Sequence, residues 1–321
     1  MSNDRFDVFS IGDASLDTYV QVPFIVGPDQ KAMGDWLGVY GGGMAANFAA
    51  AAANAGATAA FMTVKGDDHA GRLLVEELRE HDVDTTTVQT LHGSNTFQCF
   101  VQLDARGEKA LFGATAGQKV PAVDDVPQAM LTRSDYVYAL ADDLQWAAAV
   151  GMRARAAGAQ FALDLEHAAV RTSLEDAINV AAGADIVFTN TQAFTEVGLS
   201  DATEILDLLT RQGIPLVVVT DGVRGSIAQD RSSRIRVTGL DVPVRDTTGA
   251  GDAHNGALLG RISQGDSLLD SMVVATAMGA LCVQHLGARG YRNAIEDNLP
   301  ALVAAARRTA TVIHEPPLTK D

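Results

Sequence analysis

Short apolar segments alternate with segments of helical periodicity along most of the chain, and this alternation restricts the fold more than any other feature. The short segments, rich in Val, Ile or Phe, are residues 6–11, 59–64, 136–140, 160–163, 185–189 and 216–220. Helical patterns occupy residues 71–81, 174–182, 202–212 and 267–285. Parallel strands need crossover connections, so this order predicts an α/β fold: a three-layer αβα sandwich around a mostly parallel sheet.

Two regions break the rhythm. Residues 14–40 contain short β-like segments around a Pro/Gly loop. Residues 95–113 contain two β-like segments joined through Asp104-Ala105-Arg106-Gly107, whose Asp and Gly favour a tight turn. We expect both regions to leave the main sheet and form a small β lid inserted in one domain that spans residues 1–321.

The charge balance disfavours some partners. The chain has 24 Lys and Arg against 40 Asp and Glu, a net charge of −16, whereas nucleic acids and anionic membranes require basic patches. No basic region followed by an apolar run begins the chain, and polar residues interrupt the alanine-rich residues 45–60, so we expect neither a signal peptide nor a membrane span. Two cysteines, Cys99 and Cys282, form no disulfide framework, which fits a reducing cytoplasm.

The clearest chemical signal lies in residues 241–260. A strand expected at residues 242–245 leads into Asp246-Thr247-Thr248-Gly249-Ala250-Gly251-Asp252, and a helix follows. Glycines let the backbone approach a ligand, and the free amides of a helix start bind anions. A carboxylate there, Asp252, can accept the proton of a hydroxyl that receives a phosphoryl group. On glycine spacing alone, a strand-to-helix turn with an Asp cap fits equally well. No Gly-Lys-Ser/Thr follows, so this is not a Walker A loop.

The whole heptad resembles the C-terminal signature of the ribokinase-like (PfkB-type) carbohydrate kinases. In that family the final Asp is the catalytic base and the Gly-Ala-Gly backbone forms the anion hole. The resemblance implies these roles for Asp252 and for Gly249, Ala250 and Gly251. It further implies ATP-dependent, Mg²⁺-assisted phosphorylation of a hydroxyl on a small carbohydrate. His254 stands where the family usually has Phe.

Two N-terminal stretches resemble the sugar-binding segments of this family. One is Gly41-Gly42-Gly43-Met44-Ala45-Ala46-Asn47, and the other is Gly12 followed five residues later by Asp17. The resemblance implies sugar contacts for Asp17, Gly42, Gly43 and Asn47, and an Asn amide both donates to and accepts from hydroxyls. Without that context the glycines would be a flexible helix start and Asp17 a surface residue.

Nucleotide contacts are implied further along the chain. Thr220-Asp221-Gly222 and Arg224-Gly225 resemble a family segment that touches nucleotide phosphate, which assigns Thr220, Gly222 and Gly225 to ATP together with Asn190 and Gly251. The family often has Asn-x-x-Glu, whose Glu helps to order magnesium and the phosphates. Here the third residue after Asn190 is Ala193, and Glu196 comes three residues later. No residue of this chain therefore clearly takes the role of the family's Glu.

A monovalent cation and a second subunit are further expectations. Gly287-Ala288 resembles the family's loop near adenine and a cation, and Asp246 and Thr248 could offer carbonyl oxygens to K⁺. Uncovered sheet edges tend to pair, so we expect a homodimer through the lid.

The acceptor and two rival functions stay open. Pentoses, ketohexoses, sugar acids, nucleosides and anionic ketoses (phospho- or sulfo-sugars) are candidates, and an anionic acceptor would need Lys31, Arg106 or Lys109 near the lid. A dinucleotide-dependent oxidoreductase is disfavoured, because no Gly-x-Gly-x-x-Gly follows the first strand. A sugar- or nucleotide-binding regulator without turnover is supported only by Ala193 and opposed by Asp252.

Overall fold

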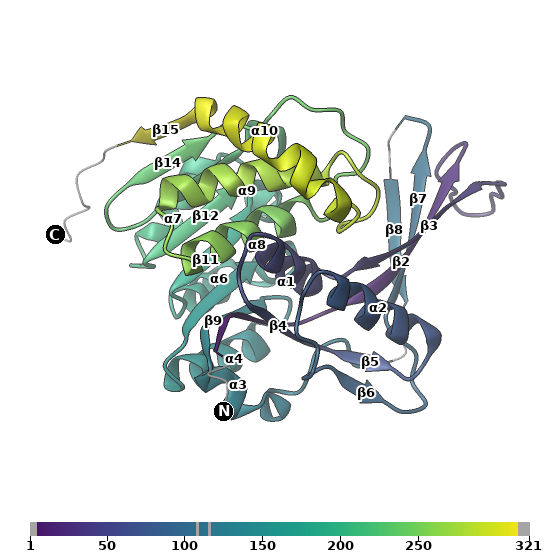
Figure 1. The fold of residues 1–321 in the computed structure, drawn as a ribbon, viewed down its shortest axis with the longest axis horizontal. Helices are drawn as coiled ribbons and strands as arrows, with labels where there is room; N and C mark the ends of the chain where they lie inside the picture. The colour runs from purple at the N-terminus through teal and green to yellow at the C-terminus, as the bar shows by residue number, and fades with distance from the viewer. Residues whose placement is uncertain (1–4, 107–108, 115–116, 314–321) are drawn as a thin grey trace.

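A nine-stranded sheet runs through the middle of the computed structural model, which describes residues 5–106, 109–114 and 117–313 (Figure 1). Its strands are β1 Phe6–Ile11, β4 Ala59–Met62, β9 Ser134–Leu140, β10 Gln160–Leu165, β11 Ile186–Asn190, β12 Leu216–Thr220, β13 Ser226–Gln229, β14 Arg234–Val237 and β15 Ala310–Ile313. They are ordered β15-β14-β13-β12-β11-β10-β9-β1-β4, parallel from β12 to β4 and antiparallel from β12 to β15.

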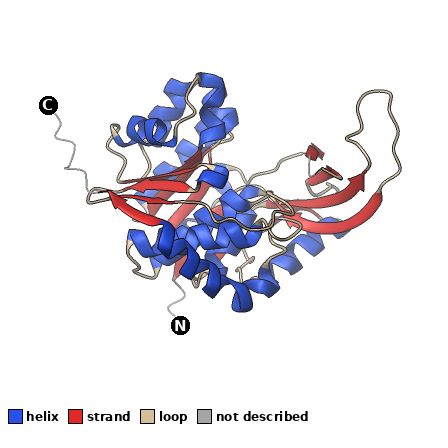
Figure 2. Cartoon of the chain, turned by 90° about the horizontal axis from the view of Figure 1, so that it is seen from above, coloured by secondary structure: helices blue, strands red, loops and turns tan. Residues whose placement is uncertain are grey.

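Helices cover both faces of this sheet (Figure 2). One layer contains α3 Gln128–Thr132, α4 Leu144–Ala156, α5 His167–Thr172, α6 Leu174–Ala181 and α7 Ala202–Thr210. The other contains α1 Met44–Asn54, α2 His69–Glu80, α8 Ala250–Ser263, α9 Leu268–Cys282 and α10 Ile295–Thr309. Short 3-10 helices span Val123–Asp125, Thr191–Val197, Gly222–Arg224 and Arg292–Ala294. The predicted αβα sandwich is confirmed. Among the helices described, none has both the length and the apolarity to cross a bilayer.

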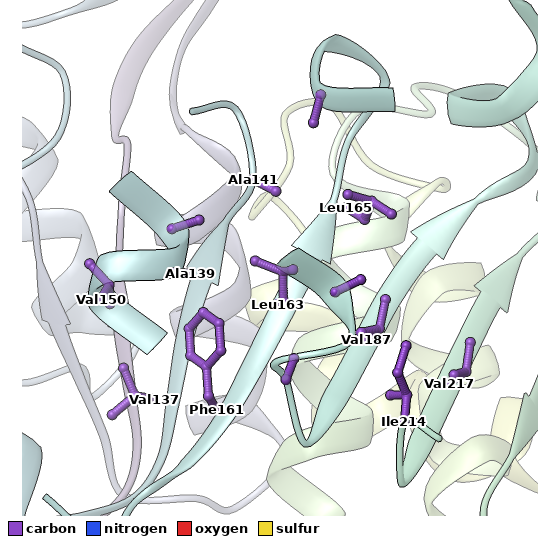
Figure 3. Packing of buried hydrophobic residues seen from close by; sticks show 14 of the residues in the cluster. Val137, Ala139, Ala141, Val150, Phe161, Leu163, Leu165, Val187, Ile214 and Val217 are labelled. Atoms are coloured by element: carbon purple, nitrogen blue, oxygen red, sulfur yellow. The ribbon is translucent and has the colours of Figure 1, made fainter. Parts of the chain in front are cut away.

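Both faces of the central strands are apolar. On β9, Val137 and Ala139 pack toward the α4 layer, while Tyr138 and Leu140 pack toward the α1 layer. Figure 3 shows the first face, where Phe161 and Leu163 of β10 lie beside these residues. Because alternate residues point to opposite faces, a strand covered by helices on both sides must be apolar throughout. Each fully buried side chain of this size stabilises the fold by about 1.5–3 kcal/mol.

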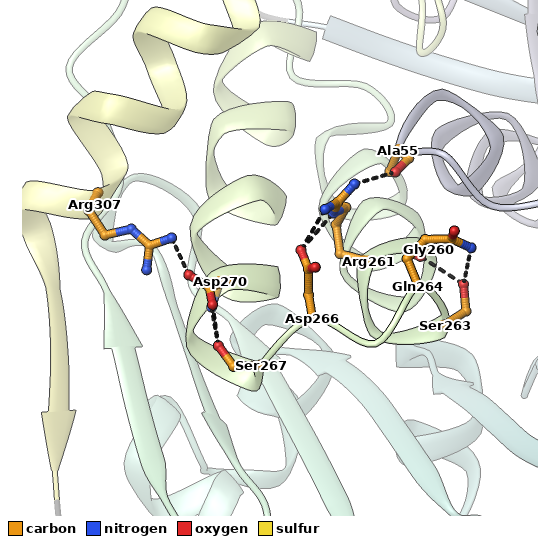
Figure 4. Close-up of polar contacts among 9 residues, drawn as sticks. All are labelled: Ala55, Gly260, Arg261, Ser263, Gln264, Asp266, Ser267, Asp270 and Arg307. Carbon is orange, nitrogen blue, oxygen red and sulfur yellow. Dashed lines mark hydrogen bonds and ion pairs between the residues drawn. The ribbon is translucent and has the colours of Figure 1, made fainter.

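Helices α1 and α8 approach each other closely along a seam of small residues. A Cβ atom on Gly256 would overlap the carbonyl oxygen of Phe48, and one on Gly260 would lie 2.8 Å from that of Ala52. The guanidinium of Arg261 on α8 also donates to the carbonyl of Ala55, 3.3 Å away (Figure 4). The two helices are therefore held in a fixed relation.

A four-stranded sheet stands beside the central one (Figure 1). Its order is β3-β2-β7-β8, with β2 Ser15–Val22, β3 Asp35–Gly42, β7 Gln98–Asp104 and β8 Lys109–Ala114. We call it the small sheet. The predicted hairpin is confirmed, since β7 and β8 pair antiparallel, although Gly107 of its turn lies outside the described residues. A separate pair, β5 Val64–Gly66 and β6 Gln89–Leu91, lies below α2 in Figure 1.

Two predicted strands differ from the structure. Residues 242–245 form no strand: the amides of Arg245 and Asp246 donate to the carbonyl of Val283 at the end of α9, over 2.7 and 3.2 Å. Pro243 has no amide to donate, and Val244 is 60% exposed. Residues 59–64 divide at Thr63 into the end of β4 and the start of β5, because the chain leaves the central sheet there.

Candidate active site

The predicted anion hole lies at the start of α8. Gly249 caps this helix in a left-handed conformation with φ 77°, and a Cβ atom there would overlap Ala288. No side chain caps the helix, so the alternative of an Asp cap is wrong. A Cβ atom on Gly251 would meet nothing within 4 Å. The first amides of α8 have no intrahelical acceptor and lie at the positive end of the helix dipole, beside open space that an anion can fill.

Asp252 is in the first turn of α8. Its Oδ2 atom accepts a hydrogen bond of 2.7 Å from Nδ2 of Asn47 on α1. Burial raises the pKa of Asp252 from 3.8 to about 7; the Asn47 bond and Arg289 oppose this rise, whereas Asp164 and Asp13 add to it. A carboxyl group with a pKa near neutrality can take up a proton and release it again, as a general base must.

The predicted sugar residues lie together next to Asp252. Asp17 on β2 is buried and accepts from Ser15 Oγ over 2.6 Å. Gly42, at the end of β3, presses its backbone against the Asp17 carboxylate, and a Cβ atom at this position would overlap it. Gly43 caps α1, the helix that carries Asn47. The structure thus brings all four predicted sugar residues into one cluster.

Arg289 completes this cluster and was not predicted. Its side chain is fully buried, and Nη1 donates to Oδ1 of Asn47 over 2.7 Å and to the carbonyl of Gly42 over 3.3 Å. Its Nη2 pairs with Glu77 over 3.1 Å. Because guanidinium only donates, Asn47 must turn its oxygen to Arg289 and its NH₂ group to Asp252. The sequence offered one hint, the adjacent Gly287-Ala288 stretch.

A buried polar chain ties α8 to the central sheet. His254 Nε2 lies 2.9 Å from Ser226 Oγ of β13, and its Nδ1 lies 3.0 Å from Asn255 Oδ1. Asn255 in turn donates to Asp164 over 3.2 Å. Burial lowers the pKa of His254 to about 4, so this ring is neutral. The His that replaces the expected Phe therefore makes hydrogen bonds in the interior.

The predicted nucleotide residues lie at the carboxyl ends of neighbouring strands. Asn190 of β11 and Thr220 of β12 are paired in register. The Asn190 side chain caps the following 3-10 helix by accepting from the amide of Ala193 over 2.8 Å. Gly222 and Gly225 bound the turn after β12, and Gly225 packs against the carbonyl of Val237 on β14. In open α/β sheets, ligands bind outside this edge.

A cavity of about 510 Å³ opens at the same edge. Its lining consists of Glu166, His167, Asn190, Gln192, Ala193, Thr195 and Glu196. Ala193 is buried, and Glu196 pairs with Nε2 of His167 over 3.1 Å. Glu166 follows β10 directly and was not predicted, because the expected strand ended three residues earlier, at residue 163. A larger cavity, about 980 Å³ between α4 and α6, contains none of the predicted site residues.

The Gly287-Ala288 loop, expected near a monovalent cation, contacts the heptad of residues 246–252. The Asp246 carboxylate accepts from Thr248 N over 2.9 Å, from Thr248 Oγ1 over 2.7 Å and from the amide of Gly287 over 3.0 Å. Lys109 of β8 donates to Thr248 Oγ1 over 2.8 Å. Arg106 instead pairs with Asp104, 2.9 Å away. A small-sheet lysine thus reaches the loop that precedes α8.

Comparison with known proteins gives one consistent family. The family model described as "pfkB family carbohydrate kinase" matches residues 5–294. The ribokinase of Haemophilus influenzae is 24% identical over 286 residues, which cover 87% of this chain and 92% of that protein. The ATP-dependent ribose-1-phosphate kinase of Halopiger xanaduensis is 27% identical over 284 residues, covering 88% and 93%.

A solved structure is similar in fold. A proposed ribokinase II from E. coli, in complex with ATP and Mg²⁺, superposes with a TM-score of 0.78 at 20% identity, over 92% of this chain and 99% of that one. The chain therefore belongs to the pfkB family of carbohydrate kinases, which are phosphotransferases with an alcohol group as acceptor.

Proposed function

We propose that this carbohydrate kinase transfers the γ-phosphoryl group of ATP to a hydroxyl of a small sugar or sugar derivative in the cytoplasm, with Asp252 as general base. The observation that carries the proposal is the 2.7 Å hydrogen bond between Asn47 and Asp252, because it joins the sugar cluster to the start of α8. A hydroxyl held by Asp17 and Asn47 lies next to a carboxylate whose pKa of about 7 suits proton transfer.

The reaction proceeds in one displacement. The acceptor oxygen forms a bond to the γ-phosphorus while the bond from that phosphorus to the β-phosphate oxygen breaks, and ADP leaves. The hydroxyl proton passes to Asp252, which later releases it to water. Amides of residues 249–251 donate to the phosphoryl oxygens, where charge develops in the transition state. Alignment of the two reactants supplies much of the rate.

Magnesium accompanies the nucleotide in this proposal and neutralises phosphate charge. Mg²⁺ is usually held by one or two carboxylates together with phosphates and water. Within the described residues no group of three or more His, Cys, Asp or Glu could hold a metal ion alone. The carboxylate of Glu166 beside Asn190 provides hard oxygen ligands, so the residues fit Mg²⁺ carried by ATP.

The small sheet acts as a lid in this proposal. Paired residues share a face, so the register of β2, β7 and β8 puts Asp17, Cys99, Val101, Leu111 and Lys109 on one surface. Asp17 belongs to the sugar cluster, so this surface faces the acceptor. Coverage of the acceptor would exclude water and limit wasteful ATP hydrolysis.

An anionic acceptor, such as a phospho- or sulfo-sugar, is the second candidate. Lys109 favours it, because its ammonium lies on the lid surface that carries Asp17; it donates to Thr248 and lies 3.9 Å from a carboxylate oxygen of Asp246. The relative that is an ATP-dependent ribose-1-phosphate kinase is named for an acceptor of this charge. Lys31 lies in an exposed loop, and Arg106 is paired with Asp104. A nucleoside has no comparable support.

The proposal is tested by ADP release with Mg-ATP against neutral and anionic sugars. Turnover with at least one sugar is expected, and Asp252→Ala should lower kcat by about 10²–10⁴-fold while the melting temperature stays close to that of the wild type. Near-normal turnover in Asp252→Ala would contradict the role of Asp252. Ligand binding without ADP release across the panel would favour a regulator.

A further inference from the structure

Glu166 is the acidic side chain whose oxygens fit Mg²⁺ in the proposed function, and its surroundings give it a more specific task. It follows β10 at the carboxyl edge of the sheet and lines the cavity that also contains Asn190. It occupies the N-cap position of α5, yet its side chain does not cap that helix. In the part of the chain that the structure describes, no side chain donates a hydrogen bond to its carboxylate, although the backbone amide of His167 does.

The other carboxylate of this cavity, and the residues at positions 190 and 193, have less to offer a cation. Ala193 has only a methyl group, and it is buried in the core under the sheet edge. Glu196 is already paired with His167. Asn190 uses its side-chain oxygen to cap the 3-10 helix. Of the two carboxylates that line the cavity, Glu166 alone is without an ion-pair partner among the described residues.

Glu166 also lies close enough to other acids to interact with them. Burial, together with the charges of Asp164 and Asp252, raises the pKa of its carboxyl to about 8. A cation placed among these groups reverses this effect, since its charge favours each ionised carboxylate. Mg²⁺ prefers such oxygen ligands and brings phosphate groups with it.

We propose that Glu166 orders the Mg²⁺ of Mg-ATP, either by direct ligation or through a bound water, and so performs the task for which Ala193 has no side chain. The inference rests on the proposed function, because it assumes that ATP binds between Asn190 and the start of α8. Glu166 is a metal-positioning residue in this view, whereas Asp252 handles the proton.

The test is calorimetric titration of the full chain with AMP-PNP, a non-transferable ATP analogue, at several Mg²⁺ concentrations. Variant Glu166→Gln removes the charge but keeps the shape, and Glu196→Gln is the matched control in the same cavity. Wild type should bind AMP-PNP more tightly as Mg²⁺ rises. In Glu166→Gln this gain should fall by about 10-fold or more, the usual size for residues that support a metal.

Without Mg²⁺ no such loss is expected. Glu166→Gln should then bind AMP-PNP about as tightly as the wild type at neutral pH, because a carboxyl with a pKa of about 8 is mostly protonated and as uncharged as the amide. Weaker binding both with and without Mg²⁺ would indicate a structural role and overturn the inference. An unchanged Mg²⁺ gain in Glu166→Gln, or an equal loss in Glu196→Gln, would also overturn it. If the wild type binds no AMP-PNP at all, the proposed function itself fails.

Discussion

The pKa of the Asp252 carboxyl group is held near 7 by burial and by neighbours with opposing effects. Burial, Asp164 and Asp13 favour its protonated form, while Asn47 and Arg289 favour the anion. Glu166 lies close enough that Asp252 raises the Glu166 pKa. The balance between these contacts therefore sets the pH range in which Asp252 is ready to accept a proton.

Activity should depend on pH through Asp252. Only the ionised carboxylate accepts a proton, and its pKa is about 7, so kcat/KM for the acceptor should fall tenfold per unit below about pH 7. Initial rates from pH 5 to 9 at saturating Mg-ATP would measure this fall of kcat/KM on the acidic side of the pH profile. A flat profile from pH 5 to 8 would exclude Asp252 as the titrating base.

Stability of the ligand-free protein should depend on the same group. The folded pKa lies above the ordinary value, so folding favours the protonated form, and that contribution is lost as pH rises through about 7. Asp252→Asn does not titrate. The melting temperature of the variant minus that of the wild type should therefore be larger at pH 8 than at pH 5. A difference that is constant with pH would show that the pKa of Asp252 is not raised by folding.

At the scale of elements, Gly249 and Gly251 at the start of α8 have different tasks. Gly251→Ala places a methyl group in open space at the helix start, so thermal stability should hold or rise by about 0.5–1 kcal/mol. The same methyl enters the proposed phosphoryl position, and kcat should fall at least about tenfold. Gly249→Ala should instead lower the melting temperature, because φ is 77° and Ala288 is in the way. Wild-type kcat in Gly251→Ala would argue against the anion hole.

Sequence patterns predicted elements well where local physics decides them. Strands β1 and β12 begin and end where expected, since each is a short apolar run that ends at a turn. The prediction of a strand at residues 242–245 was wrong, because an alternating pattern does not reveal that the carbonyl of Val283 accepts hydrogen bonds from the amides of Arg245 and Asp246. The motif residues of the candidate site were predicted from the resemblance to the carbohydrate kinase family. Arg289 was not predicted, because its partner Asn47 is 242 residues away in the sequence. A buried contact between such distant residues leaves no periodic pattern in the sequence.

At the scale of the whole molecule, the outer surface of the small sheet is apolar. Register puts Trp36, Val39 and Phe112 on the surface opposite Asp17, and their exposed fractions are 66, 39 and 57%. Phe112 stacks on Phe100 with ring centroids 5.1 Å apart. Such a surface on a sheet with open edges suits a second copy of the chain.

A homodimer is therefore expected, and Phe112→Asp should convert it to monomer. The variant places a charge in the proposed interface, which is costly to bury. Sedimentation equilibrium at micromolar concentration measures the mass. The control is Met152→Asp, because Met152 is 69% exposed on α4, which lies on the other side of the molecule from the small sheet in Figure 1. A monomeric wild type would refute the dimer.

Arg289 has a consequence for how such kinases diverge. It contacts Gly42, Asn47 and Glu77 of the N-terminal part of the chain, yet it follows α8 and α9 in the sequence. A hybrid gene with its crossover in the middle would take these partners from two parents. It should remain active only where the N-terminal parent supplies Glu77 and Asn47 and the C-terminal parent supplies the guanidinium. Residues 77 and 289 therefore have to be inherited together for their ion pair to form.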